Sequence, residues 1–131
     1  LEELRRDPRI AWVFHDPRSS TQVRVDGVAS MHVQDEIARE RWERTGLWSR
    51  RSYLVENAPG AEISEPGSGL PVELEGRAPS MEESAGGLNH FGVVVTRATA
   101  LEWLWLSAKG HRRARWEYED GAEPRGRWLV P

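Results

Sequence analysis

Residues 21–33 alternate between apolar and polar side chains more regularly than any other stretch of the chain. The odd positions carry Thr, Val, Val, Gly, Ala, Met and Val, and the even positions are polar except for Val28. A period of two predicts a β-strand with one face turned toward a core. The alternation keeps its phase through Asp26-Gly27, a pair that also suits a hairpin turn. We therefore expect one long strand, bent at Gly27, as is typical of a small antiparallel barrel.

Helical patterns and a long loop occupy the middle of the chain. Asp35 is a good N-cap for the helical spacing that follows it, and Asp7-Pro8 ends the helix-forming residues at the start. The loop is rich in Pro, Gly, Ser and Glu. Helices are expected at residues 1–6, 34–45 and 49–55, and at 80–85 inside a long loop over 58–89.

The last third of the chain returns to strand patterns. β-branched and aromatic residues are frequent there, and turn residues separate the segments. An earlier segment, residues 10–15, is apolar on both faces and is expected to be a buried strand. Further strands are expected at residues 91–97, 100–106, 111–118 and 127–130. The fold class is therefore α+β and mainly β, with an antiparallel barrel and one or two flanking helices.

Composition narrows the function classes. The chain has 18 Lys and Arg against 21 Asp and Glu, a net charge of −3, so no overall positive field favours nucleic acid. No apolar run approaches the roughly 20 residues that cross a bilayer. There are no cysteines, and the histidines show no metal-binding spacing, so we expect no metal site. We expect a cytoplasmic protein without nucleic-acid or membrane partners.

The basic stretch at residues 111–115, HRRAR, is the strongest candidate for a site. On a strand, His111, Arg113 and Arg115 share one face and would repel one another unless an anion or carboxylates lie among them. The stretch is either a binding site for a phosphate or a ring carbonyl, or a solvated basic face.

Two further pairs of strand residues leave two interpretations each. Gln22 and Arg24 share the polar face of the long strand, where they either contact a ligand or simply face solvent. Trp103 and Trp105 either cover a flat ring system or belong to the core.

Four stretches of the chain together resemble the pyridoxamine 5′-phosphate oxidase-like family of FMN-binding split barrels. They are LRRDPRIAWVF at 4–14, STQVRVDG at 20–27, SRRS at 49–52, and a tail with LEW at 101–103, HRRAR at 111–115 and WLVP at 128–131. The resemblance implies a homodimer with FMN at the subunit interface. Gln22 would contact the flavin, and Trp105 and Arg115 would approach it from the partner subunit. Leu104 replaces Trp105 if the intervening loop holds one extra residue.

The same resemblance implies that Arg51, Ser52 and Arg113 lie near the phosphate of a substrate. Three features differ from true oxidases. The family's strands that hold the FMN phosphate precede the first matching stretch, so we expect a single domain over residues 1–131 that lacks them. The Arg-x-His pair of the oxidases reads His111-Arg112-Arg113 here, and the loop over 58–89 is different.

The sequence therefore predicts an FMN-binding relative of the oxidase, with FMN as cofactor and a small-molecule substrate. A flavin-dependent oxidoreductase is the first expectation. A non-catalytic flavin- or haem-binding module, or a reductase that uses the deazaflavin F420, is the alternative.

Overall fold

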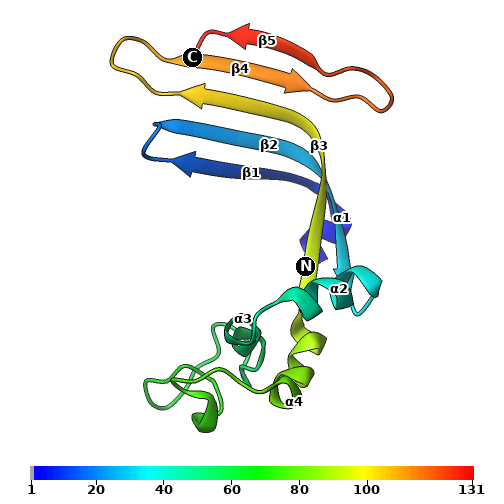
Figure 1. The fold of residues 1–131 in the computed structure, drawn as a ribbon, viewed down its shortest axis with the longest axis vertical. Helices are drawn as coiled ribbons and strands as arrows, with labels where there is room; N and C mark the ends of the chain where they lie inside the picture. Colours follow the sequence, from blue (N-terminus) through cyan, green and yellow to red (C-terminus); the bar gives the residue numbers. More distant parts are fainter. Residues whose placement is uncertain (1) are drawn as a thin grey trace. The chain divides into compact units, whose positions relative to one another are not determined.

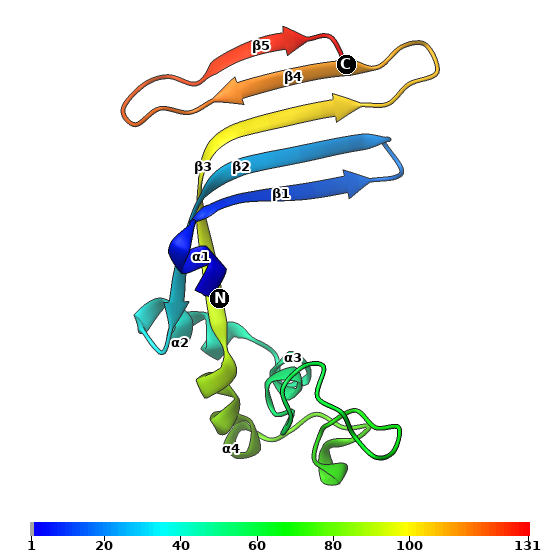
Figure 2. The same ribbon diagram turned by 180° about the vertical axis from the view of Figure 1, so that it is seen from behind.

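The computed structural model describes residues 2–131 and divides into two compact units. Residues 2–30 and 95–131 form a unit that we call the sheet unit, and residues 31–94 form a unit that we call the helical unit. Figures 1 and 2 show both units from opposite sides. The two are described separately below, and the number of domains stays a prediction.

The sheet has five strands in the order β1-β2-β3-β4-β5, so each strand lies beside its neighbour in sequence (Figure 1). The chain is α+β with an antiparallel sheet, which confirms the predicted fold class. The strands are β1 (Arg9–Asp16), β2 (Thr21–Val33), β3 (Gly92–Trp105), β4 (Arg112–Glu117) and β5 (Arg125–Leu129). The predicted long strand at 21–33 is confirmed as β2, whereas the segments 91–97 and 100–106 form the single strand β3. The residues that join them, Ala98 and Thr99, include no turn-forming residue that would interrupt the strand.

Gly27 allows β2 and β3 to approach closely. A Cβ atom at this position would lie 2.5 Å from the carbonyl oxygen of Arg97 and 2.6 Å from the Thr96 methyl carbon. No real side chain tolerates such contacts, so the site requires glycine. The role that the structure shows for Gly27 is close backbone packing inside the sheet, and the predicted bend at Gly27 stays a prediction.

The two faces of the sheet have opposite chemistry. Residues directly opposite each other in an antiparallel ladder lie on the same face. Glu102 pairs with Arg115, which pairs with Arg127, while Trp103 pairs with Ala114, which pairs with Trp128. The indole rings of Trp103 and Trp128 meet edge to face at 6.3 Å. We call the first side the charged face and the second the aromatic face.

Strand β1 lies at one edge of the sheet, next to β2. The indole nitrogen of Trp12 donates to the Thr96 hydroxyl at 2.8 Å. The prediction that this apolar strand is buried is wrong, because Val13 is 59% and Phe14 58% exposed. The physical reason is the strand's position at the edge, where it has a neighbouring strand on one side only.

The helices of the helical unit are short. One further short helix, α1 (Glu2–Arg6), belongs to the sheet unit. The main helix, α2 (Glu36–Arg44), begins where the Asp35 side chain accepts a hydrogen bond of 2.9 Å from the Ala38 amide, as predicted. The remaining elements are α3 (Leu47–Arg50), α4 (Met81–Ser84) and 3-10 helices at Arg51–Tyr53, Val72–Leu74 and Ala85–His90. The predicted helices at 34–45 and 80–85 are confirmed, and that at 1–6 is confirmed over 2–6, since residue 1 lies outside the described residues. The helix predicted at 49–55 is instead α3 followed by the 3-10 helix Arg51–Tyr53.

Aromatic residues form the core of the helical unit. Ala38, Trp42 and Phe91 are buried, and Tyr53, Leu88 and Val93 pack against them. The rings of Trp42, Tyr53 and Phe91 meet edge to face with centroids 5.1–5.7 Å apart, the arrangement that aromatic pairs favour. In the part of the chain that the structure describes, every helix is too short or too polar to span a bilayer.

Candidate functional site

A continuous chain of ion pairs crosses the charged face from β2 to β5. We call these residues the charged cluster: Arg24, Asp26, Glu102, Arg113, Arg115, Glu117 and Arg127. Strand alternation brings them together, because each occupies a position on the same side of its strand. They come from four strands of the sheet unit, so the site depends on the assembled sheet and not on any local motif.

Arg115 lies at the centre of the charged cluster. Its Nη1 is 3.4 Å from Asp26 Oδ2 and 3.7 Å from Glu102 Oε2, and its Nε is 3.3 Å from Glu117 Oε1. These contacts are long for charge-assisted hydrogen bonds, which are usually about 2.7–2.9 Å. Three carboxylates therefore surround this guanidinium without saturating its donors. The outer contacts are shorter: Arg24–Asp26 at 2.8 Å, Arg113–Glu102 at 2.9 Å and Arg127–Glu117 at 2.7 Å.

Guanidinium groups lower the pKa values of two carboxylates of the cluster, Asp26 and Glu117. Hydrogen bonds from Arg24, and more weakly from Arg115, lower the pKa of Asp26. Hydrogen bonds from Arg127 and Arg115 lower the pKa of Glu117. With four guanidinium groups and three carboxylates, the cluster has one positive charge in excess at neutral pH.

Arg113 has a donor that nothing satisfies. Its Nη2 donates to Glu102 Oε2 at 2.9 Å, while its Nε is buried without a hydrogen-bond partner among the described residues. A buried donor without an acceptor costs about 1–3 kcal/mol. Together with the excess positive charge, this donor makes the charged face suitable for an acceptor group such as a carbonyl, carboxylate or phosphate.

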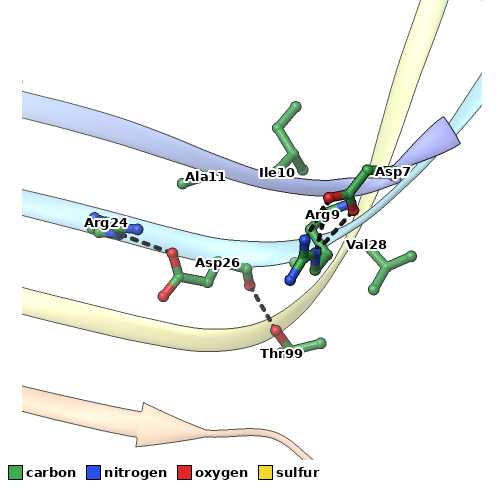
Figure 3. A pocket seen from close by; sticks show the side chains of 9 residues that line it. Asp7, Arg9, Ile10, Ala11, Arg24, Asp26, Val28 and Thr99 are labelled. Atoms are coloured by element: carbon green, nitrogen blue, oxygen red, sulfur yellow. Dashed lines mark hydrogen bonds and ion pairs between the residues drawn. The ribbon is translucent and has the colours of Figure 1, made fainter. Parts of the chain in front are cut away.

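An open hollow borders the cluster at β1 and β2 (Figure 3). Ion pairs Asp7–Arg9 and Arg24–Asp26 lie along it, and the Thr99 hydroxyl donates to the Asp26 carbonyl at 3.2 Å. The hydrogen bond from Arg9 lowers the pKa of Asp7 to about 2. The charges beside the hollow are thus already paired with one another. Its lining residues are Asp7, Arg9, Ile10, Ala11, Arg24, Asp26, Gly27, Val28 and Thr99.

Comparison with solved structures decides the fold. A pyridoxamine 5′-phosphate oxidase-related, FMN-binding protein from Nostoc punctiforme matches 99% of this chain with a TM-score of 0.75 at 15% identity. PhzG from Burkholderia lata, solved in complex with tetrahydrophenazine-1-carboxylic acid, matches 99% with a TM-score of 0.65 at 15% identity. The chain has the pyridoxamine 5′-phosphate oxidase-like fold.

The chain spans about two thirds of the length of these two oxidase-like proteins, 66% of the first and 62% of the second. No protein-family model matches the sequence, and no curated protein matches it either. The likeness to oxidase-like proteins therefore lies in the fold, which the four sequence stretches had indicated.

The structure brings most of the predicted oxidase-like site residues of the sheet unit onto one face. Gln22 follows the same alternation as Arg24 and Asp26, so it lies on the charged face with Arg113 and Arg115. Gln22 lies four positions before Asp26 on β2, a distance of about 13 Å along a strand. Gln22 and Arg115 therefore occupy separate parts of the charged face.

Trp105 lies on the other side of the sheet from Arg115. It pairs with Arg112 on the aromatic face, whereas Leu104 pairs with Arg113 on the charged face. The alternative position that the sequence left open, Leu104, is thus the one that shares a face with Arg115. The assignment of Trp105 as a flavin contact stays a prediction.

Arg51 and Ser52 belong to the helical unit, in the 3-10 helix Arg51–Tyr53. The Arg51 guanidinium donates to the carbonyls of Leu74 and Arg77 at 3.2 and 3.4 Å and stacks on the Trp48 ring at 4.7 Å. These contacts tie the long loop to α3. The predicted role of Arg51 and Ser52 near a substrate phosphate stays a prediction.

Sequence reasoning missed the carboxylates of the cluster. Asp26, Glu102 and Glu117 were not predicted as site residues, although the repulsion expected between Arg113 and Arg115 required carboxylates or an anion nearby. That repulsion was the available signal, but the partners come from other strands. Among residues 2–131 no three His, Asp or Glu side chains are arranged to hold a metal ion.

Proposed function

We propose that this chain binds FMN on the charged face and acts as a flavin-dependent oxidoreductase on a small molecule. The observation that carries the proposal is the charged cluster, with its excess positive charge, on a fold shared with an FMN-binding protein. The buried Arg113 Nε fits the same proposal, since flavins and their phosphate offer many acceptors and few donors.

Gln22 and Arg115 are the proposed flavin contacts of the charged face. The amide of Gln22 both donates and accepts hydrogen bonds, so it matches a ring edge that alternates carbonyl and N–H groups. The positive charge of the Arg115 guanidinium favours negative charge near it. FMN supplies the redox chemistry when it is bound, and these side chains orient the ring and adjust its electrostatic environment.

Arg113 is the proposed contact for an acidic group of the substrate. Its position two residues from Arg115 on the same face would put such a substrate beside the flavin. PhzG was solved with a carboxylic acid built on a fused, partly reduced ring system. Carboxylic acids on fused rings, flat acids among them, are reasonable first compounds to test. Arg51 and Ser52 are further candidates for this contact.

The active form is proposed to be a homodimer. Large apolar side chains are exposed on the sheet unit, including Trp12 at 40%, Phe14 at 58% and Trp128 at 74%. Aromatic residues are enriched at subunit interfaces, where their area is buried. These residues lie on the aromatic face, so the approach of Arg115 from one subunit to the flavin held by the other rests on the family resemblance alone.

The test is a spectrum followed by reduction. Protein equilibrated with FMN and freed of unbound flavin should keep a yellow chromophore, and NADH or NADPH should bleach it under anaerobic conditions. Protein that stays colourless would refute the proposal. Retained flavin that neither nicotinamide nor any flat acid reduces would favour the non-catalytic module, and tighter binding of F420 than FMN would favour the deazaflavin reductase.

A further inference from the structure

Glu102 lies between the two arginines that the proposed function uses. One oxygen, Oε2, is 2.9 Å from Arg113 Nη2 and 3.7 Å from Arg115 Nη1. Glu102 is directly opposite Arg115 in the β3–β4 ladder and diagonal to Arg113. Its side chain is only 15% exposed, less than any other side chain in the charged cluster.

This geometry has an electrostatic reason. Arg113 and Arg115 project from the same side of β4 at two-residue spacing, where like charges repel. A carboxylate between them offsets the repulsion and, because it is shielded from water, acts at a lower effective dielectric than an exposed one. Asp26 and Glu117, the other carboxylate partners of Arg115, form no ion pair with Arg113. Among the described residues, Glu102 is therefore the carboxylate that links the two guanidinium groups.

We infer that Glu102 is a positioning residue that holds Arg113 and Arg115 in place and limits the positive charge that a bound flavin experiences. The inference rests on the proposed FMN binding. Reduction adds two electrons and one proton to oxidised FMN and leaves a net negative charge on the ring system. Nearby positive charge therefore favours the reduced form, and Glu102 opposes that preference.

The test compares midpoint potentials of FMN bound to the whole chain, measured against a reference dye during slow reduction. Glu102→Gln preserves the shape and removes one negative charge, so the excess charge of the cluster rises. The ratio of reduced-FMN affinity to oxidised-FMN affinity should increase roughly tenfold, which is about 30 mV for a two-electron couple. Glu102→Asp keeps the charge and should restore most of the original potential.

The matched control is Asp120→Asn. Asp120 pairs with Arg97 in the same unit, and the side chains are 86% and 60% exposed, outside the charged cluster. This variant loses the same charge and should leave the potential unchanged. If Glu102→Gln shifts the potential no more than Asp120→Asn, the inference is wrong while FMN binding stands. If the unaltered chain binds no FMN, both the inference and the proposed function are wrong.

A second variant covers the case in which Glu102→Gln does not fold. The double variant Glu102→Gln with Arg113→Gln removes both members of the 2.9 Å pair and restores the charge balance. It should fold, because we expect the stability lost in Glu102→Gln to come from the Arg113 charge, which is left beside Arg115 without its carboxylate partner. Its FMN should have a potential close to that of the original chain. A double variant as unstable as the single one would contradict the positioning role.

Discussion

The Asp26 carboxylate on β2 lies 3.4 Å from the Arg115 guanidinium on β4, across the intervening strand β3. These residues are 89 positions apart in the sequence. Their contact joins the first hairpin of the sheet to the last, on the face where Gln22 also lies. The candidate site therefore depends on correct strand order, and changes to the sheet or to the cluster should have separable effects.

Gly27 should be essential for the sheet. Replacing it with Ala places a Cβ 2.5 Å from the Arg97 carbonyl oxygen, a clash with backbone that β2 and β3 relieve only by separating. We expect Gly27→Ala to lower the free energy of unfolding by about 1–3 kcal/mol or more. Chemical denaturation measures this. Gly86→Ala is the control, because nothing lies within 4 Å of its added Cβ, and equal losses in both variants would contradict the close approach.

Arg50 should stabilise the helical unit. It is 3% exposed, donates to the carbonyls of Thr45, Trp42 and Glu43, and lies over the Trp42 ring at 4.8 Å. Arg50→Met leaves the carbonyls at the end of α2 without these donors. Urea denaturation should show a loss of about 2–4 kcal/mol.

Arg44→Met is the matched control for Arg50. Its i,i+4 pair with Glu40 is exposed, at 68% and 49%, so its loss should cost only about 0.3–0.5 kcal/mol. Comparable losses for the two variants would mean that the buried guanidinium contributes no more than an exposed one.

Lowering the pH should weaken the Arg77–Glu83 ion pair over a defined pH range. Hydrogen bonds from Arg77 and the Ser80 amide lower the pKa of Glu83 to about 2, from an ordinary value of 4.5. A lowered carboxyl pKa in the folded state gives stability that is present above the unfolded value and lost as the pH falls through the folded one. The contribution should therefore fade between about pH 4.5 and 2. Carboxyl NMR titration measures it, and Arg77→Gln should move the Glu83 pKa back toward its ordinary value.

Substitutions of Leu104 and Trp105 test which of these two residues contacts the flavin. Leu104 shares the charged face with Arg113, and Trp105 lies on the aromatic face. If the pairing of β3 with β4 decides the contact, Leu104→Asn weakens FMN binding severalfold more than Trp105→Asn does. Flavin fluorescence titration gives both dissociation constants. A larger loss of FMN affinity for Trp105→Asn would instead support Trp105 as the flavin contact, which is what the family resemblance implies.

Local patterns predicted the elements well because their causes are local. The alternation at 21–33 and the Asp35 cap each depend on residues a few positions apart. The exposure of Val13 and Phe14 depends on strand order, which no single stretch contains.

Pairing between distant strands decides which of the predicted residues share a face at the candidate site. Strand parity placed Arg113 and Arg115 together correctly, but the hairpin between β3 and β4 fixes whether Leu104 or Trp105 joins them. Arg50 was overlooked for a similar reason. A basic residue in a polar stretch gave no sign that the end of α2 would fold around it.

The most direct test of the central claim is the affinity of FMN for Arg115→Gln compared with Arg97→Gln. Arg97 pairs with Asp120 at an exposed position of the same unit, so both variants lose one positive charge. Loss of a charge-assisted contact is worth about 1.5–3 kcal/mol, so Arg115→Gln should raise the FMN dissociation constant at least about tenfold. Arg97→Gln should leave it within about twofold of the original chain. Equal affinities for the two variants would contradict a flavin site on the charged face.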